Sequence, residues 1–230
     1  DVASGTGVVA RLAARHAGSA GRVVASDVSG PMLAYAGTLP GPTDAAPIQY
    51  LEGSAADLPV PDGTFDVAVC QQGLPFFADR PAAAAEMRRA LRPGGVVGVA
   101  VWAAGHRLGP FDDYSEALAS AEIEPPYPRA YETASFVMGV DEVRGLLSGA
   151  GFSEIGASEV SYELVWPDAD SAAAGILGTP FGPLVSGLDP DRRAAVDAEL
   201  GRRFASSSPA EPVRRRTTAV LARAVVPGGD

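Results

Sequence analysis

The stretch Asp1-Val2-Ala3-Ser4-Gly5-Thr6-Gly7 decides the fold that we expect. Gly5 and Gly7 allow a tight turn and let a ligand approach the backbone, because neither residue carries a β-carbon. Apolar residues recur at helical spacing from Val8 to His16, so the turn leads into a helix whose first amide groups are free to bind a ligand. The motif is weak on its own, because glycine turns before helices also occur in folds that bind no nucleotide.

Two carboxylates follow at positions where neighbouring strands are expected to end. Asp27 ends the apolar run 22–27, and its two oxygens suit the pair of hydroxyls on a ribose. Asp57 follows the run 48–53, where a carboxylate suits the amino hydrogen of adenine and the apolar Leu58 suits the ring. An Asp at such a position is otherwise often a helix cap. Three such features at the ends of consecutive strands converge on one crevice.

Short apolar runs alternate with helical segments along the first hundred residues. We expect strands at 22–27, 48–53, 65–70 and 96–102, the second and third of them buried, with helices that begin at Pro31 and at Arg80. This repeated order predicts a parallel sheet covered by helices on both faces.

The pattern loosens after Trp102. Helical spacing predicts helices near 111–121, 141–149 and 190–204, and apolar runs predict strands within 153–165 and 217–226. We interpret 1–230 as a single domain in which 1–103 form the cofactor-binding half, and 104–140 and 167–208 are substrate-facing insertions.

Five ordered motifs in about the first hundred residues resemble the class I S-adenosylmethionine-dependent methyltransferases, specifically small-molecule enzymes related to the ubiquinone and menaquinone C-methyltransferases. The matching segments are 1–7, 24–27 with Met32-Leu33, 53–59, 63–67 with 71–74, and 91–95. The resemblance weakens after Trp102, apart from the turn Ala150-Gly151-Phe152. It implies an α/β Rossmann-like three-layer sandwich, with a mostly parallel seven-stranded sheet, an antiparallel last strand and a helical lid insertion.

The resemblance also implies that the chain binds S-adenosyl-L-methionine and transfers its methyl group. In the family the glycine loop holds the methionine part of the cofactor, the acids at positions 27 and 57 hold ribose and adenine, and the backbone near Gln71 completes the methionine site. Ser4 departs from the Gly or Cys of many relatives. The cofactor-binding residues expected on this basis are Asp1, Ala3, Gly5, Gly7, Asp27, Val28, Met32, Ala56, Asp57, Leu58, Gln71 and Gln72.

Methyl transfer is an in-line displacement on an activated methyl, so alignment and exclusion of water matter most, and no metal or covalent nucleophile is required. His106 is the candidate catalytic base for an oxygen acceptor, although a loop histidine is usually only a solvated side chain. The candidate substrate-binding residues are Phe76, Phe77, Trp102 and Tyr114, with Tyr127 and Tyr131 as further candidates. We assign no function to the run 214–216, because a charged run before an edge strand is usually solvated.

Composition restricts the partners. The net charge of −10 disfavours nucleic acid and an anionic membrane surface, and the single cysteine, Cys70, leaves no disulfide and no thiolate cluster for zinc. No apolar stretch approaches the roughly 20 residues of a membrane span. We expect a cytoplasmic bacterial monomer or homodimer that methylates O, C or N of a small molecule, in secondary metabolism.

The chain begins on the cofactor motif without a methionine, so an upstream strand and helix could belong to the native protein.

Two alternatives remain open. The first is a methyltransferase-fold protein that binds the cofactor but catalyses another reaction, such as cyclisation, or none. The second is a nicotinamide-dependent oxidoreductase, because Gly5, Gly7 and Asp27 would also suit a dinucleotide, although Asp57 and Leu58 would then have no explanation.

Overall fold

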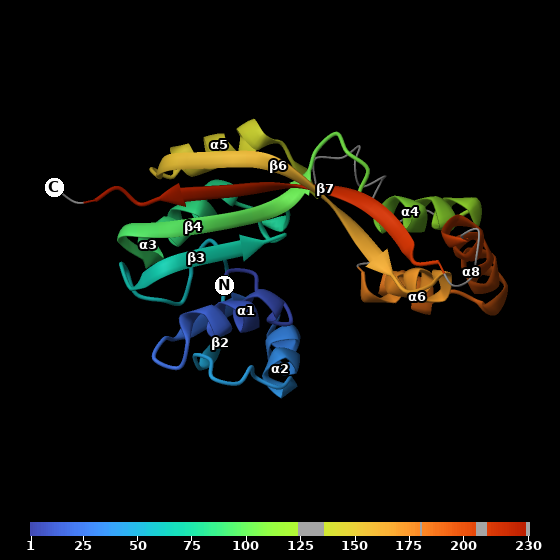
Figure 1. Cartoon of the computed structure of the whole chain (residues 1–230), viewed down its shortest axis with the longest axis horizontal. Helices are drawn as coiled ribbons and strands as arrows, with labels where there is room; N and C mark the ends of the chain where they lie inside the picture. Colours follow the sequence, from blue (N-terminus) through green and yellow to red (C-terminus); the bar gives the residue numbers. More distant parts are fainter. Residues whose placement is uncertain (124–135, 180, 206–210, 229–230) are drawn as a thin grey trace. The chain divides into compact units, whose positions relative to one another are not determined.

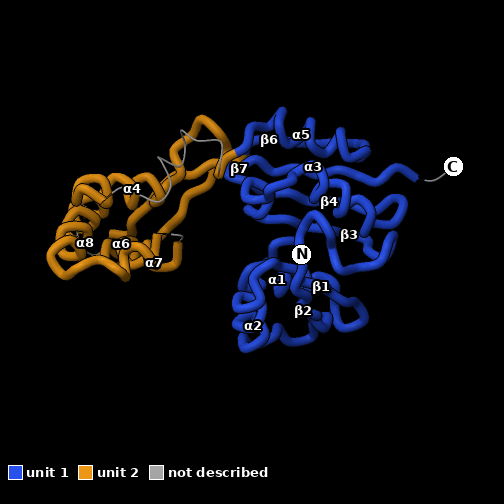
Figure 2. The backbone as a smooth tube through the Cα atoms, turned by 180° about the vertical axis from the view of Figure 1, so that it is seen from behind, with its two compact units in different colours: residues 1–102, 138–159, 220–230 blue, residues 103–137, 160–219 orange. Residues whose placement is uncertain are grey.

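The computed structural model describes residues 1–123, 136–179, 181–205 and 211–228. The chain divides into two compact units (Figure 2). Unit 1 comprises Asp1–Trp102, Met138–Glu159 and Val220–Asp230, and unit 2 comprises Ala103–Val137 and Val160–Ala219. Unit 2 takes in most of the two segments interpreted as insertions. The organisation as a single domain stays a prediction.

Unit 1 alternates strands and helices over its first hundred residues (Figure 1). Its elements are α1 (Val8–Ala17), β1 (Val23–Asp27), α2 (Gly30–Thr38), β2 (Ile48–Glu52), β3 (Phe65–Gln71), the 3₁₀ turn η1 (Leu74–Phe76), α3 (Arg80–Ala90), β4 (Leu91–Ala103), β5 (Val137–Met138) and α5 (Val140–Gly149), with parts of β6 (Ser153–Trp166) and β7 (Val213–Val225). Proline in the first turn sets the start of α2 and α3, and the side chains of Ser29 and Asp79 cap these helices.

The described strands form two sheets. β1 pairs with β2, and a second sheet has the order β3-β4-β7-β6 with β5 paired to β4. Both β1–β2 and β3–β4 are parallel. Gly94 at the start of β4 donates to the carbonyl of Val226 just after β7, over 2.9 Å, so β4 and β7 run antiparallel.

The first residues of the chain hydrogen-bond to both sheets. The amide of Val2 donates to the carbonyl of Val69 in β3, and the amide of Ser4 donates to the carbonyl of Ser26 in β1, over 2.8 and 3.0 Å. The segment from Asp1 to Ser4 therefore lies between β1 and β3 and bonds on either side. The glycine turn therefore begins beside the ends of β1 and β3.

Three expectations from the sequence need correction. β4 begins at Leu91 rather than at residue 96, because Phe65 pairs with Leu91 and the register then shifts. No residue of β2 is buried, since β2 pairs only with β1 and stands at the end of its sheet. In β3 only Ala68 and Cys70 are buried, whereas Val67 is 57% exposed.

Cys70 is the one cysteine of the sequence and lies in β3 with 1% of its surface exposed. Burial raises the pKa of its thiol to about 11, because a thiolate loses its hydration in an apolar surrounding. Cys70 is therefore a small apolar core residue of unit 1 at neutral pH.

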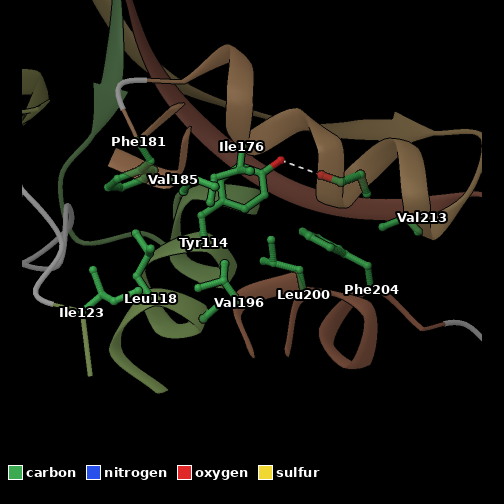
Figure 3. Close-up of a cluster of buried hydrophobic side chains, with 12 residues drawn as sticks. Tyr114, Leu118, Ile123, Ile176, Phe181, Val185, Val196, Leu200, Phe204 and Val213 are labelled. Atoms are coloured by element: carbon green, nitrogen blue, oxygen red, sulfur yellow. Dashed lines mark hydrogen bonds between the residues drawn. The ribbon is translucent and has the colours of Figure 1, made fainter. Parts of the chain in front are cut away.

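Unit 2 has a helical core. It contains α4 (Pro110–Ser120), α6 (Ala169–Ala174), the 3₁₀ turn η2 (Gly175–Gly178), α7 (Gly182–Ser186) and α8 (Pro190–Phe204), with the remaining parts of β6 and β7. Figure 3 shows the buried cluster in which Tyr114 packs among Ile176, Leu200 and Phe204. Within the described ranges, none of the helices is long and apolar enough to cross a membrane.

Candidate functional site

A cavity of about 260 Å³ opens in unit 1 where the predicted cofactor motifs meet. Four segments line it, each at or just beyond the end of a strand or of the opening turn: Val2–Ala3, Ser26–Val28, Gly53–Ala56 and Phe76–Asp79. Ligands of open α/β sheets bind in this position, outside the carboxyl ends of parallel strands. Small residues from Gly53 to Ala56 form one part of its wall, and the rings of Phe76 and Phe77 form another.

Asp27 connects the glycine turn to the cavity. One carboxylate oxygen accepts the amide of Gly5 over 2.8 Å, and the other accepts the amide of Ser29 over 2.9 Å. A carboxylate has about four acceptor positions, so two remain for further donors. The two backbone bonds fix the orientation of the side chain, and the free positions match a pair of ribose hydroxyls.

The turn from Ala3 to Gly7 has left-handed backbone at three residues. Ala3, Gly5 and Gly7 have φ values of 57°, 53° and 77°. Glycine adopts this conformation readily, whereas Ala3 is strained in it. Such strain in a non-glycine residue is typical of functional sites, and Ala3 lines the cavity.

Ser26 has a polar atom without a protein partner at the cavity. It is 5% exposed, and its Oγ is buried without a hydrogen bond among the described residues. A buried hydroxyl without a partner costs free energy unless a ligand or water satisfies it. Together with the free positions of Asp27, this atom makes the cavity suited to a polar ligand such as the ribose of an adenosyl group.

The loop that carries Asp57 and Leu58 is held by α3. Glu86 accepts the amide of Leu58 over 2.8 Å, and Arg89 donates to the carbonyl of Leu58 over 3.0 Å. Arg89 also donates to Asp62 over 2.6 Å, so one guanidinium fixes the loop at two places. Leu58 is buried by this arrangement, while the side chain of Asp57 is exposed and does not line the cavity.

Gln72 joins the ends of β3 and β4. Its side-chain oxygen accepts the amide of Trp102 over 3.0 Å, and its backbone has a φ of 58°. Gln71 is exposed at the end of β3. Neither glutamine lines the cavity, so the strained backbone of Gln72 sets the path of the chain toward Phe76 rather than a wall of the cavity.

The structure brings some of the predicted residues together and not others. Ala3, Asp27, Val28 and Ala56, from the cofactor set, and Phe76 and Phe77, from the substrate set, line this cavity. Gly5 touches it through Asp27, and Met32 lies beside Gly5. The sequence analysis did not select Val2, Ser26, Gly53, Ser54, Ala55, Ala78 or Asp79 as site residues, although most stand inside or next to the quoted motifs.

The remaining predicted residues lie elsewhere. Asp1, Gly7, Asp57, Leu58, Gln71, Gln72 and Trp102 are not among the residues that line the cavity. His106 lines a second cavity that belongs to unit 2. Tyr114 is 1% exposed, and its hydroxyl donates to the carbonyl of Ala172 over 2.7 Å. Burial raises the pKa of Tyr114 to about 12, and the ring packs in the hydrophobic core of unit 2. Tyr127 and Tyr131 lie outside the described residues.

Several known methyltransferases are similar to this chain in sequence. The model of the Methyltransferase domain family matches residues 1–99. The nocamycin O-methyltransferase of Saccharothrix syringae is 30% identical over 225 residues, which cover 93% of this chain and 79% of that protein. A demethylmenaquinone methyltransferase of Thermus thermophilus is 39% identical over 95 residues, covering 41% of this chain and 42% of that enzyme.

Solved structures agree in fold. A putative methyltransferase from Bacillus halodurans superimposes with a TM-score of 0.57 at 18% identity, over 99% of this chain and 91% of that one. The [4+2]-cyclase SpnF superimposes with a TM-score of 0.57 at 23% identity, over 100% of this chain and 74% of that one. These likenesses confirm the expected α/β Rossmann-like fold.

The sequence identity to the relative from Saccharothrix syringae extends over nearly the whole of this chain. The family model covers the segments that line the cavity in unit 1. The resemblance read from the five motifs is thereby confirmed. The chain belongs to the class I S-adenosylmethionine-dependent methyltransferases that act on small molecules.

Proposed function

We propose that the cavity of unit 1 binds S-adenosyl-L-methionine through Asp27 and that the chain methylates a small secondary metabolite, as the name of its relative from Saccharothrix syringae suggests. The observation that carries this proposal is the arrangement of Asp27, whose carboxylate is fixed by the amides of Gly5 and Ser29 and keeps two acceptor positions. The unpartnered hydroxyl of Ser26 supports it.

The residues present fit the cofactor. Asp27 would hold the ribose, and the small residues from Gly53 to Ala56 leave room for the adenine ring. The strained turn at Ala3 would face the methionine part. Asp57 follows the cavity-lining Ala56 and is exposed, and it would contact the adenine amino group from there.

The cofactor supplies a methyl group activated by a sulfonium. The chain's own residues must align the acceptor atom with that methyl and keep water away. Phe76 and Phe77 form the apolar part of the cavity wall and would exclude water there. In the transfer a lone pair of the acceptor forms a bond to the methyl carbon, the carbon–sulfur bond breaks, and its electron pair returns to sulfur.

A neutral hydroxyl or amine acceptor must also lose a proton. We propose His106 as the group that accepts it, since an imidazole is the side chain that most often accepts a proton in such reactions. An acceptor that is already an anion would need no such base.

We further propose that the two described sheets form one seven-stranded sheet. The segment from Asp1 to Ser4 would be its middle strand, because that segment bonds to β1 and to β3. The strand order would then be β2-β1-(1–4)-β3-β4-β7-β6, with β7 as the antiparallel member.

Calorimetric titration tests the cofactor assignment. S-adenosylhomocysteine, the product form, is expected to bind with micromolar affinity, and NAD is expected not to bind at the same concentrations. Binding of NAD with a similar affinity would contradict the proposal and favour the oxidoreductase.

A second candidate is a rearrangement such as cyclisation on the same fold. The likeness to the [4+2]-cyclase SpnF favours it, because that fold hosts a reaction other than methylation. Incubation of the protein with S-adenosylmethionine and a library of hydroxylated, acidic and polyene metabolites separates the two. Release of S-adenosylhomocysteine supports methyl transfer. Conversion of a polyene substrate to an isomer of equal mass, without that release, would support cyclisation.

A further inference from the structure

Ser26 directly precedes Asp27 in β1 and lines the cavity of unit 1. Its backbone is held on one side by the first residues of the chain. The amide of Ser26 donates to the carbonyl of Asp1 over 2.8 Å, and its carbonyl accepts the amide of Ser4 over 3.0 Å. On the other side Ser26 pairs with Leu51 of β2. Hydrogen bonds to both neighbours therefore fix the position of this residue at the cavity.

The side chain of Ser26 is buried without a hydrogen bond. The residue is 5% exposed, and its Oγ atom has no partner among the residues that the structure describes. A hydroxyl loses its hydration when it is buried, and the loss stays uncompensated until a further group bonds to it. A polar group that binds at Ser26 therefore gains more free energy than one that binds at an exposed hydroxyl, which must first release water.

The carboxylate of Asp27 creates a need for a donor nearby. An ionised carboxylate only accepts hydrogen bonds, so the ligand groups that suit the free positions of Asp27 are hydroxyls that donate to it. A ligand hydroxyl that donates to Asp27 still has two lone pairs, which accept hydrogen bonds. A hydroxyl enclosed in the cavity thus needs a donor from the protein as well as an acceptor.

Two side chains of the lining can donate. Among the lining residues that the structure describes these are Ser26 and Ser54, because the two aspartates of the lining only accept when they are ionised. Ser54 is exposed, and its Oγ atom already accepts the amide of Ala56 over 3.1 Å. Ser26 is adjacent to Asp27 and has an unused hydroxyl, so it is the better donor to a group that Asp27 binds.

We propose that Ser26 donates a hydrogen bond to one ribose hydroxyl of the cofactor, so that this hydroxyl donates to Asp27 and accepts from Ser26. The proposal rests on the proposed function, because it assigns a further contact to the same ligand. It adds to the site a residue that the sequence analysis did not select. It also gives Ser26 a part in distinguishing a ribonucleoside from a deoxyribonucleoside.

A second cavity offers an alternative role for the same hydroxyl. Ser26 also lines a smaller cavity of about 40 Å³, together with Asp1 and several apolar side chains. The Oδ2 atom of Asp1 is likewise buried without a partner among the described residues. A hydroxyl turned toward Asp1 would stabilise the interior of unit 1 instead of the ligand. The two roles differ in what the loss of the hydroxyl does to the protein without ligand.

Thermal unfolding of Ser26→Ala separates these roles. Alanine removes a buried hydroxyl that has no partner, so the melting temperature of the protein without ligand should stay the same or rise. A hydroxyl bonded to Asp1 would instead make that temperature fall in the variant. S-adenosylhomocysteine should raise the melting temperature less in Ser26→Ala than in the wild type, because the variant binds it more weakly.

Calorimetric titration of the full chain with three ligands identifies the contact. The ligands are S-adenosylhomocysteine and its 2′-deoxy and 3′-deoxy analogues. Ser26→Ala is expected to bind S-adenosylhomocysteine about 5-fold more weakly than the wild type, which is the usual effect of one neutral hydrogen bond. For the analogue that lacks the contacted hydroxyl, the same substitution should cost less than about 2-fold, because the bond is already absent.

Ser54→Ala is the matched control, since it removes the other hydroxyl of the cavity lining. Its effect on affinity, of whatever size, should be equal for all three ligands. Only Ser26→Ala should therefore show an effect that depends on a ribose hydroxyl.

Three outcomes would overturn the proposal. They are an unchanged affinity of Ser26→Ala for S-adenosylhomocysteine, an equal loss for all three ligands, and a lower melting temperature of the variant without ligand. In each of them the wild type still binds S-adenosylhomocysteine, so the proposed function stands. A wild type that does not bind S-adenosylhomocysteine would instead contradict the proposed function and this contact together.

Discussion

Units 1 and 2 differ in how their cavities are built. In unit 1 the cavity is formed by backbone turns and small residues at strand ends, and the carboxylate of Asp27 lines it. In unit 2 the cavity is formed by long charged side chains that come from segments far apart in the sequence, such as Arg215 and Asp113, which are 102 positions apart. A cavity of the first kind is set by local sequence, and one of the second kind by tertiary packing.

Ligand binding in the cavity of unit 1 and packing in the core of unit 2 are therefore expected to respond to separate changes. Substitutions in the core of unit 2 should leave the affinity for S-adenosylhomocysteine unchanged, and substitutions beside Asp27 should leave the stability of unit 2 unchanged.

The largest effect is expected from Phe204→Ala. Phe204 is 1% exposed and packs edge-on against Tyr114 with ring centroids 5.9 Å apart. Loss of the ring should lower the free energy of unfolding of unit 2 by about 3–5 kcal/mol, because the cavity left behind adds to the lost transfer energy. Urea unfolding followed by the fluorescence of Trp166, in a Trp102→Phe background, measures it, since Trp166 packs against the same cluster.

The exposed Val160→Ala serves as the control for that substitution, with little change expected. A concurrent loss of affinity for S-adenosylhomocysteine in folded Phe204→Ala protein would break the comparison, because it would couple the two units.

Asp27→Ala is expected to lower the affinity for S-adenosylhomocysteine by about 100-fold, since each hydrogen bond to a charged group contributes about 1.5–3 kcal/mol. The substitution also removes the acceptor of the amides of Gly5 and Ser29, so a modest loss of stability in unit 1 should accompany it. Calorimetric titration measures the affinity. Asp66→Ala is the matched control, because Asp66 is exposed on β3 and lies outside the cavity. Unchanged affinity in Asp27→Ala would remove Asp27 from the site.

Asp112→Asn should change how the stability of unit 2 depends on pH. Burial raises the pKa of Asp112 from 3.8 to about 6. Between pH 4 and pH 6 the carboxyl of Asp112 is therefore protonated in the folded protein and ionised in the unfolded chain. Asp112 thus makes stability fall as pH rises from about 4 to about 6. Asparagine still accepts the amide of Leu108 and carries no charge. The free energy of unfolding of the wild type should therefore fall between pH 4 and pH 7 by roughly 2 kcal/mol more than that of the variant.

Urea unfolding at pH 4 and at pH 7, read from Trp166, measures this change. An identical pH dependence in the wild type and in Asp112→Asn would show that Asp112 does not carry the effect.

Tyr114→Phe should have the smallest effect. It removes the hydroxyl that donates to the carbonyl of Ala172 and leaves the ring in place. A loss of about 1 kcal/mol in the stability of unit 2 is expected, with unchanged affinity for S-adenosylhomocysteine and unchanged transfer rate. A fall in transfer rate without a change in stability would instead return Tyr114 to the substrate-binding residues.

The order of helices and strands in unit 1 was predictable from the sequence, because its signals are local. Glycines mark the turn, prolines mark the first turns of α2 and α3, and the strand ends place Asp27 beside Gly5. The exposure of Asp57 was not predictable in this way, because it follows from Glu86 and Arg89 on α3, which pull Leu58 inward.

Unit 2 was predicted less well. The helix at 190–204 was found, since α8 is long enough to show a period. The six-residue α6 and the five-residue α7 were not, because segments of fewer than two turns carry no hydrophobic period. The run 214–216 was expected to be solvated and to precede an edge strand. Arg214 and Arg216 are exposed as expected, but the run lies inside β7, which stands between β4 and β6, and Arg215 pairs with Asp113.

The burial of Cys70 has a practical consequence for spectroscopy. Its thiol is almost wholly protonated at neutral pH and is enclosed by β3 and its neighbours, so maleimide reagents should not modify it. New cysteines at exposed positions such as Thr38 in α2 and Ala119 in α4 would then accept fluorophores without prior removal of the native thiol. A donor and an acceptor dye at these two positions would report the distance between the units in solution, with and without S-adenosylhomocysteine.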